Sequence, residues 1–193
     1  MSEWDFTGLS DDEGIAVRQA IEVGDDLQWR FGERSLGFIV RNYIKLAEMG
    51  RLEAYWLSTY LHNSHFEHIG FGELKAVFDA CDRTKLQELS GPVRNGISTE
   101  RISLFRGCGG LVHTRGMSWT PSLDKAIWYA AWHREWHLDR EQSAEVAVYA
   151  TTVCFSEVYC RLEHNEDEVL VVPDNMWRIE VPASEFRLDR PRH

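Results

Sequence analysis

The sequence of 193 residues lacks long apolar runs and is short of positive charge. No apolar stretch reaches the roughly 18 residues that a membrane-crossing helix needs. Lysine and arginine number 21 against 31 acids, which gives a net charge of −10. This balance argues against general binding to nucleic-acid backbones, which depends on phosphate neutralisation, although it leaves room for a local basic groove. The acidic opening stretch, MSEWDFTGLSDDEG, is unlike a secretory signal, so we expect a cytoplasmic protein with no membrane partner.

Cysteine is also scarce, and its spacing does not suggest a metal site. The four cysteines form no CxxC pair: Cys81, Cys108, Cys154 and Cys160. In a cytosolic chain we expect them to be reduced and mostly buried. His133 and His137 are four residues apart, but Arg134 stands where a zinc protease needs glutamate. We therefore expect no bound metal.

Several catalytic and nucleotide-binding signatures are absent as well. The glycine-rich GCGG at 107–110 does not fit the G-x-G-x-x-G dinucleotide loop, and a long helix does not follow it at once. The chain contains neither a Walker sequence nor the G-x-S-x-G of serine hydrolases. These absences exclude a Rossmann-type oxidoreductase, a P-loop enzyme and an α/β-hydrolase.

The patterning changes from helical to strand-like near Gly96. Before it, helical spacing of apolar residues predicts helices over 35–49, with Gly50 as C-cap, and over 51–62 and 72–89. After it, short apolar or alternating runs predict strands at 102–105, 117–120, 144–155, 169–172 and 177–181. One long helix is expected over 122–137 between them. The sequence therefore predicts an α+β fold, with helices first and a mainly antiparallel sheet after them.

Three tryptophans on the expected long helix form a stripe, because they recur every four residues: Trp128, Trp132 and Trp136. Large aromatic residues in such a stripe normally pack against a sheet. The alternative is that one of them lines a pocket for a planar ring.

The stretch NEDEVLVVP, residues 165–173, places three acids directly before a strand-like run. In extended chain, residues two apart point to the same face, so Glu166 and Glu168 would lie side by side. Such a pair suits a site that needs two carboxylates. The alternative is a solvated turn that leads into a buried strand.

Three short motifs follow one another within about 75 residues: RISLFRG (101–107), GMSWTPSLDKA (116–126) and NEDEVLVVP (165–173). In order and in strand context they resemble the mono-ADP-ribosyltransferases of the R-S-E type, the clostridial and cholera toxin-like family. Family members carry an arginine at the end of the first core strand, a Ser-x-Ser/Thr strand before a helix, and Gln/Glu-x-Glu just before a later strand. The middle motif here is SWT, where the family more often has STS.

The resemblance implies that the chain uses NAD as co-substrate and breaks its nicotinamide–ribose bond. Arg106 would grip the diphosphate, and Gly107 would let the backbone approach the nicotinamide. Ser118 would hold the catalytic carboxylate in position, with Thr120 supporting the strand beside it. All four would belong to the NAD-binding site.

The same resemblance assigns roles to the two glutamates. Glu168 would stabilise the cationic ribose that develops as the bond breaks. Glu166 would orient or deprotonate the incoming nucleophile. Crowding two carboxylates together raises the pKa of one of them, which suits a proton acceptor.

We therefore expect an ADP-ribosyltransferase-like split two-sheet core over 98–193, with a helical N-terminal region, 1–97, packed on it. The expected activity is transfer of ADP-ribose to a macromolecule, with protein arginine favoured and a nucleic-acid base second. A toxin, a toxin–antitoxin component or a phage-defence effector fits this activity, and an antitoxin or inhibitor protein is then an expected partner. The alternatives are an NAD glycohydrolase and a catalytically inactive NAD-binding or adaptor module.

Overall fold

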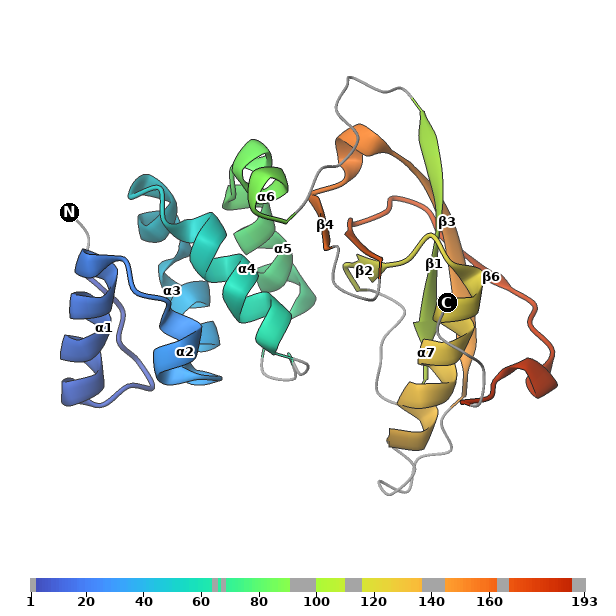
Figure 1. The fold of residues 1–193 in the computed structure, drawn as a ribbon, viewed down its shortest axis with the longest axis horizontal. Helices are drawn as coiled ribbons and strands as arrows, with labels where there is room; N and C mark the ends of the chain where they lie inside the picture. The colour runs from blue at the N-terminus through green and yellow to red at the C-terminus, as the bar shows by residue number, and fades with distance from the viewer. Residues whose placement is uncertain are drawn as a thin grey trace. The chain divides into compact units, whose positions relative to one another are not determined.

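The computed structural model describes residues 3–63, 66, 69–90, 100–109, 116–136, 145–162 and 167–188. The chain divides into two compact units, Met1–Leu89 and Ser90–His193 (Figure 1). The boundary expected between residues 97 and 98 lies outside the described residues. Each unit has its own hydrophobic core.

The described part of the first unit is built from helices: α1 (Asp11–Val23), α2 (Leu27–Phe31), α3 (Arg34–Glu48), α4 (Leu52–His62), α5 (Phe71–Ala80) and α6 (Arg83–Ser90). Its core is filled by large side chains such as Trp56, Phe38 and Phe78, all fully buried. The expected helices at 35–49 and 51–62 are confirmed as α3 and α4. Gly50 follows α3 in the left-handed region, with φ of 67°, which is the conformation that ends a helix.

The single helix expected over 72–89 is wrong, because the chain breaks between α5 and α6. Asp82 caps the new helix: its Oδ1 accepts hydrogen bonds from the backbone N–H of Thr84 at 2.9 Å and of Lys85 at 3.4 Å. The buried carboxylate of Glu53 accepts from the backbone N–H of Asp82 at 2.8 Å. The helical spacing of apolar residues continues across this break. The sequence signal that marks the break is Asp82, a residue type that favours the N-cap of a helix.

The described part of the second unit contains two three-stranded sheets. Sheet A has the order β1 (Arg101–Cys108), β3 (Ala147–Cys154), β6 (Trp177–Ile179), and sheet B has the order β2 (Ser118–Trp119), β5 (Glu168–Leu170), β4 (Cys160–Leu162). Every pairing within these strands is antiparallel. The α+β class and the antiparallel sheets are as expected from the sequence; β4 was not expected.

Apolar side chains of the two sheets form one cluster: Leu104, Trp119, Val153, Val158, Val169 and Val171. A second cluster lies on the other face of sheet A, where α7 (Leu123–Trp136) runs alongside β1 (Figure 1). Sheet A is therefore covered on both faces, by sheet B and by α7. Strand β1 of sheet A also contacts β2 of sheet B, so it links the two sheets.

The sheet-facing side of α7 is made of alanines, not tryptophans. Ala126 and Ala130 are fully buried against sheet A. Trp128 and Trp132 are half-buried and stack on each other, with ring centroids 6.2 Å apart, and Trp128 Nε1 donates to the Leu188 carbonyl at 3.4 Å. For Trp128 and Trp132 the expectation that the stripe packs on the sheet is wrong, because Gly107 in β1 and Gly109 just after it bring the helix backbone too close for large side chains.

Candidate functional site

The predicted site residues that the structure describes lie where sheet A meets sheet B. Phe105 of β1 forms a bridge with Thr120, just after β2, through two backbone hydrogen bonds of 2.8 and 2.9 Å. Next along the chain, β2 pairs with β5. Three strands that come from distant parts of the sequence are thus consecutive neighbours, and each carries one of the predicted residues Arg106, Ser118 and Glu168.

The guanidinium of Arg106 is held against backbone. Its Nη1 donates to the carbonyl oxygen of Ser118 at 2.8 Å. It also lies over the bare Cα of Gly116, where an added Cβ would come within 2.7 Å of Nη1 and still closer to the rest of the group. The side chain is half-buried, so one contact from β2 and one from the preceding loop fix its plane.

Arg106 also affects a neighbouring thiol. Burial raises the pKa of Cys108, while the positive charge of Arg106 and its hydrogen bond to the thiol oppose that rise. Arg106 and Cys108 are two apart in β1 and so share a face of sheet A. All four cysteines are free thiols, and Cys154 is the one that is not fully buried.

Ser118 and Glu168 lie on the same face of sheet B. Ser118 pairs with Leu170 and Trp119 with Val169, so the register places Glu168 opposite Thr120. Since side chains alternate along a strand, Trp119 and Val169 point into the apolar cluster while Ser118 and Glu168 point away from it. Both are partly exposed.

The charge of Glu168 affects the pKa of Cys160, on the neighbouring strand β4. Burial raises the pKa of the Cys160 thiol to about 12, and the negative charge of Glu168 adds to this rise. The carboxylate of Glu168 therefore lies beside a thiol that stays protonated.

The side chain of Thr120 stabilises the turn that precedes α7. Its Oγ1 accepts from the backbone N–H of Ser122 at 3.2 Å, and Ser122 Oγ accepts from Lys125 N–H at 3.3 Å. Thr120 is 6% exposed. Its hydroxyl therefore ties the end of β2 to the first turn of α7, a supporting position; an NAD contact by Thr120 stays a prediction.

Gly107 is accounted for by helix packing. A Cβ at this position would overlap the carbonyl of Ala126 and lie 2.7 Å from the backbone nitrogen of Ala130, both in α7. Gly109 meets the same helix, with an added Cβ only 2.5 Å from the carbonyl oxygen of Ala130. Gly107 in β1 and Gly109 just after it permit a close contact with the helix. The nicotinamide contact predicted for Gly107 stays a prediction.

The acid cluster differs from the extended chain that the sequence suggested. Asp167 has φ of 54°, in the left-handed region, and its carboxylate forms an ion pair with Arg161 of β4. The hydrogen bond from Arg161 holds the pKa of Asp167 below its usual range, with the charges of Arg161 and Lys125 adding to this effect. The premise that placed Glu166 and Glu168 on one face is therefore wrong, and Glu166 itself lies outside the described residues.

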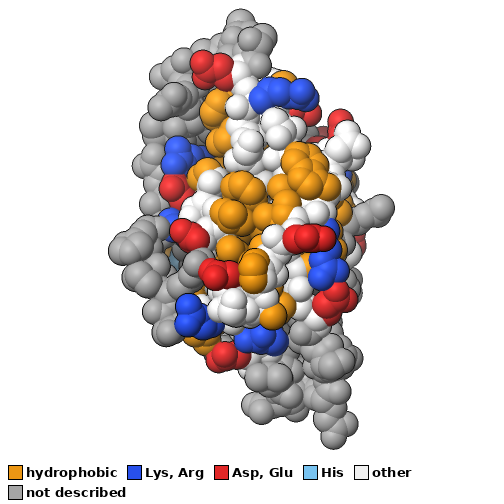
Figure 2. All heavy atoms as spheres, turned by 90° about the vertical axis from the view of Figure 1, so that its right-hand side faces the viewer, with side chains coloured by type: hydrophobic (Ala, Val, Ile, Leu, Met, Phe, Trp, Pro, Cys, Tyr) orange, Lys and Arg blue, Asp and Glu red, His pale blue; other side chains and the backbone are white. Residues whose placement is uncertain are grey.

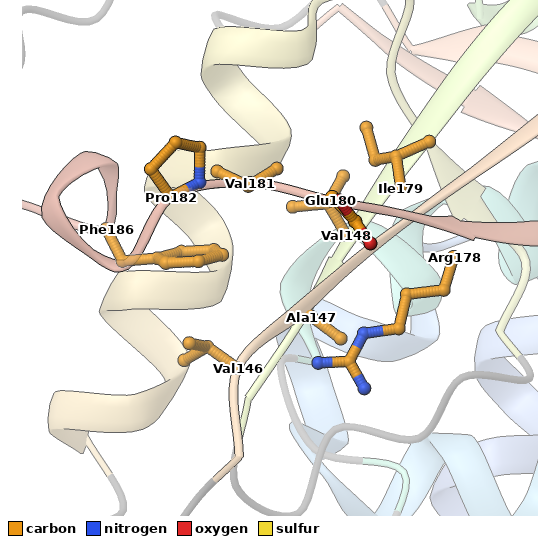
Figure 3. Close-up of a pocket in the computed structure, with 9 residues that line it drawn as sticks. All are labelled: Val146, Ala147, Val148, Arg178, Ile179, Glu180, Val181, Pro182 and Phe186. Atoms are coloured by element: carbon orange, nitrogen blue, oxygen red, sulfur yellow. The ribbon is translucent and has the colours of Figure 1, made fainter.

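A hollow of about 720 Å³ lies away from these residues, along β6 and the segment after it (Figure 3). Its lining is mostly apolar: Val146, Ala147, Val148, Arg178, Ile179, Glu180, Val181, Pro182 and Phe186. On the face seen from the right-hand side of Figure 1, hydrophobic side chains gather between charged ones (Figure 2). In the described part of the chain this hollow contains none of the residues predicted from the motifs.

The motifs did not reveal three charged or aromatic residues near the site. Arg161 and Tyr149 belong to strands β4 and β3, and Arg178 lies on β6. No short motif surrounds them, and only strand register places them. The alternation in 144–155 did carry a signal, because it placed Tyr149 on the face opposite Val148.

Comparison of the chain with protein-family models, curated proteins and solved structures found no match. Among the described residues, no helix is both long and apolar enough to cross a membrane. The functional argument therefore depends on the geometry of the site.

Proposed function

We propose that the second unit breaks the nicotinamide–ribose bond of NAD and transfers ADP-ribose to a macromolecule. The observation that carries this proposal is the placement of Arg106, Ser118 and Glu168 on three consecutive neighbouring strands, β1, β2 and β5. They are the three residues that resemble the R-S-E set of mono-ADP-ribosyltransferases. An arginine, a serine and a carboxylate held in this way have distinct tasks in that reaction.

Arg106 is suited to the diphosphate of NAD. A guanidinium is a planar fork that bonds phosphate oxygens in pairs, which a lysine cannot do. The bond to the Ser118 carbonyl and the contact with Gly116 orient that plane before substrate arrives. An oriented donor loses less conformational entropy on binding, and that favours affinity.

Glu168 is suited to the charge that develops on the ribose. Loss of nicotinamide leaves positive charge on the sugar, and a carboxylate fixed beside it stabilises the transition state more than the ground state. Glycosidases use carboxylates for a related cation. Placement on a paired strand, between β2 and β4, holds Glu168 rigidly, while Ser118 lies on the same face of the adjoining strand.

The acceptor we favour is a protein arginine. The basis is the resemblance at Glu166, since Glu at this position accompanies arginine acceptors in the family. A nucleic-acid base is the second acceptor, and the net charge of −10 argues against broad binding to nucleic acid. Water as acceptor would make the protein an NAD glycohydrolase.

The first test measures nicotinamide release from NAD by the wild type and by Glu168→Gln. We expect the substitution to reduce release by at least about 100-fold, the size of effect seen when a group that stabilises a developing charge is removed. Glu88→Gln, an exposed acid on α6, is the matched control and should leave release unchanged. Equal release by wild type and Glu168→Gln would remove Glu168 from the mechanism.

A further inference from the structure

A row of three side chains crosses sheet A on the face that carries Arg106. The register pairs Arg106 with Tyr149, and Tyr149 with Arg178. Directly paired residues of antiparallel strands point to the same face, so both arginines flank the tyrosine. With strands spaced by about 4.8 Å, the two arginine backbones lie roughly 10 Å apart. Two long side chains at this separation can converge on one diphosphate.

The two ends of this row differ in their surroundings. At one end Arg106 is half-buried and bonded to the Ser118 carbonyl. Tyr149, in the middle, is half-buried at the margin of the apolar cluster between the sheets. At the other end Arg178 is exposed: it leaves β6 on the side opposite Ile179 and borders the hollow (Figure 3). Exposure therefore increases along the row, and Arg178 is its solvent-accessible end.

Arg178 already holds an anion of the chain itself. Its Nη1 contacts the Glu145 carboxylate at 2.5 Å, and the two side chains are 53% and 74% exposed. An ion pair so exposed contributes little to stability. Neither partner is therefore needed for folding, and the carboxylate occupies the position on the guanidinium that a phosphate would take.

We propose that Arg178 is a second cation of the dinucleotide site: it binds the diphosphate of NAD together with Arg106, and Glu145 competes with that diphosphate for it. This inference rests on the proposed function, because it assigns a further contact to the same substrate. It adds a residue to the three that the motifs name, and it predicts that Glu145 lowers the affinity for NAD.

The test is calorimetric titration with ADP-ribose, which carries the diphosphate but not the bond that is cleaved. Arg178→Gln should weaken binding by about 10-fold, the loss expected for a charge-assisted hydrogen bond. Glu145→Gln should tighten binding by about 3-fold, the size of an exposed ion pair that no longer competes. The double variant should bind like Arg178→Gln, since Glu145 acts only through Arg178.

Two controls separate this from a general charge effect. Arg101→Gln removes one charge from the other end of β1 and should leave affinity within about 2-fold of wild type, since Arg101 is exposed and distant from the row. Adenosine, without phosphate, should bind all variants alike. A gain in affinity for Glu145→Gln cannot come from a misfolded protein.

The inference is overturned if Arg178→Gln binds ADP-ribose no more weakly than Arg101→Gln, if Glu145→Gln shows no gain, or if wild type does not bind ADP-ribose. Its failure is distinct from failure of the proposed function. Nicotinamide release with unchanged affinity in Arg178→Gln retains the enzyme and rejects this contact. The predicted affinity pattern without nicotinamide release retains the contact and rejects the enzyme.

Discussion

Arg106 shows how one side chain can be oriented by the absence of another. Its guanidinium occupies the space where a side chain at Gly116 would be, and the Ser118 carbonyl fixes one of its nitrogens. The RISLFRG motif identifies the arginine. Gly116 carries no chemistry of its own, so its part in the site becomes visible only from the contact.

Gly116→Ala should therefore weaken ADP-ribose binding by about 10-fold, because the added methyl group displaces the guanidinium and its charge-assisted bonds. The midpoint of thermal unfolding should change little, since a long flexible side chain can move aside. Gly72→Ala is the matched control, because an added Cβ there meets nothing within 4 Å. Unchanged affinity in Gly116→Ala would show that the orientation of Arg106 does not matter for binding.

At Asp167 both the backbone conformation and the side-chain charge contribute to the structure. Its left-handed backbone turns the chain into β5, and Arg161 holds its carboxylate. Because the pKa of Asp167 is lowered in the folded protein, the ion pair stabilises the fold above the ordinary value of 3.8. That contribution is lost as the pH falls through the lower, folded value.

We predict that Asp167→Asn lowers the free energy of unfolding near neutral pH by under about 1 kcal/mol, since the pair is partly exposed. Asparagine tolerates the left-handed backbone, so the turn itself should persist. Urea unfolding of both proteins across the acid range should show the difference begin to shrink near pH 3.8 and vanish below the lowered pKa of the folded protein. A difference independent of pH would mean that the charge of Asp167 contributes nothing.

The packing of α7 on β1 depends on backbone contact. Gly107 in the strand and Gly109 just after it face Ala126 and Ala130 in the helix, and no side chain separates them at Gly107. The helix starts from Thr120 and Ser122, directly after the site. Its position therefore influences where β2 ends and how Arg106 and Ser118 meet.

Gly107→Ala should destabilise the protein by about 3 kcal/mol, because the clash is with backbone atoms that cannot rotate away. Urea unfolding would measure this loss. Gly72→Ala again serves as control. A stable Gly107→Ala variant with weakened NAD binding would instead favour the nicotinamide contact that the resemblance predicts for Gly107.

The elements that sequence patterns predict best are those with an uninterrupted period. Alternation predicted β3, and helical spacing predicted α3 and α4. The break at Asp82 was missed because apolar periodicity runs through it, and β4 because three residues are too few for a pattern. The tryptophan stripe on α7 suggested the wrong packing face. Glycines in and just after β1, far away in the sequence, determine which face of the helix packs on sheet A.

For the candidate site, the motifs selected the residues to consider, whereas the surroundings of these residues come from the structure alone. Arg106, Ser118 and Glu168 lie on neighbouring strands, as the motif order implied. The side-by-side pair of Glu166 and Glu168 had assumed an extended backbone, and one left-handed residue between them removes that assumption. Arg178 could not be predicted, since its place beside Tyr149 follows only from strand register.

The division of the chain has a consequence for function. The second unit contains all the described residues of the candidate site, together with its own core. The described part of the first unit is built from helices. Because the proposed function assigns bond cleavage to the second unit, the test for transfer to a macromolecule uses the full chain.

The most direct measurement is incubation of the full chain with adenine-labelled NAD in a cell extract, beside Glu168→Gln. We predict that label enters a macromolecular fraction with the wild type alone, and that protease, not nuclease, releases it. Release of label by nuclease would assign a nucleic-acid base as acceptor. Label found only as free ADP-ribose, or equal labelling by Glu168→Gln, would contradict a transferase built on Arg106, Ser118 and Glu168.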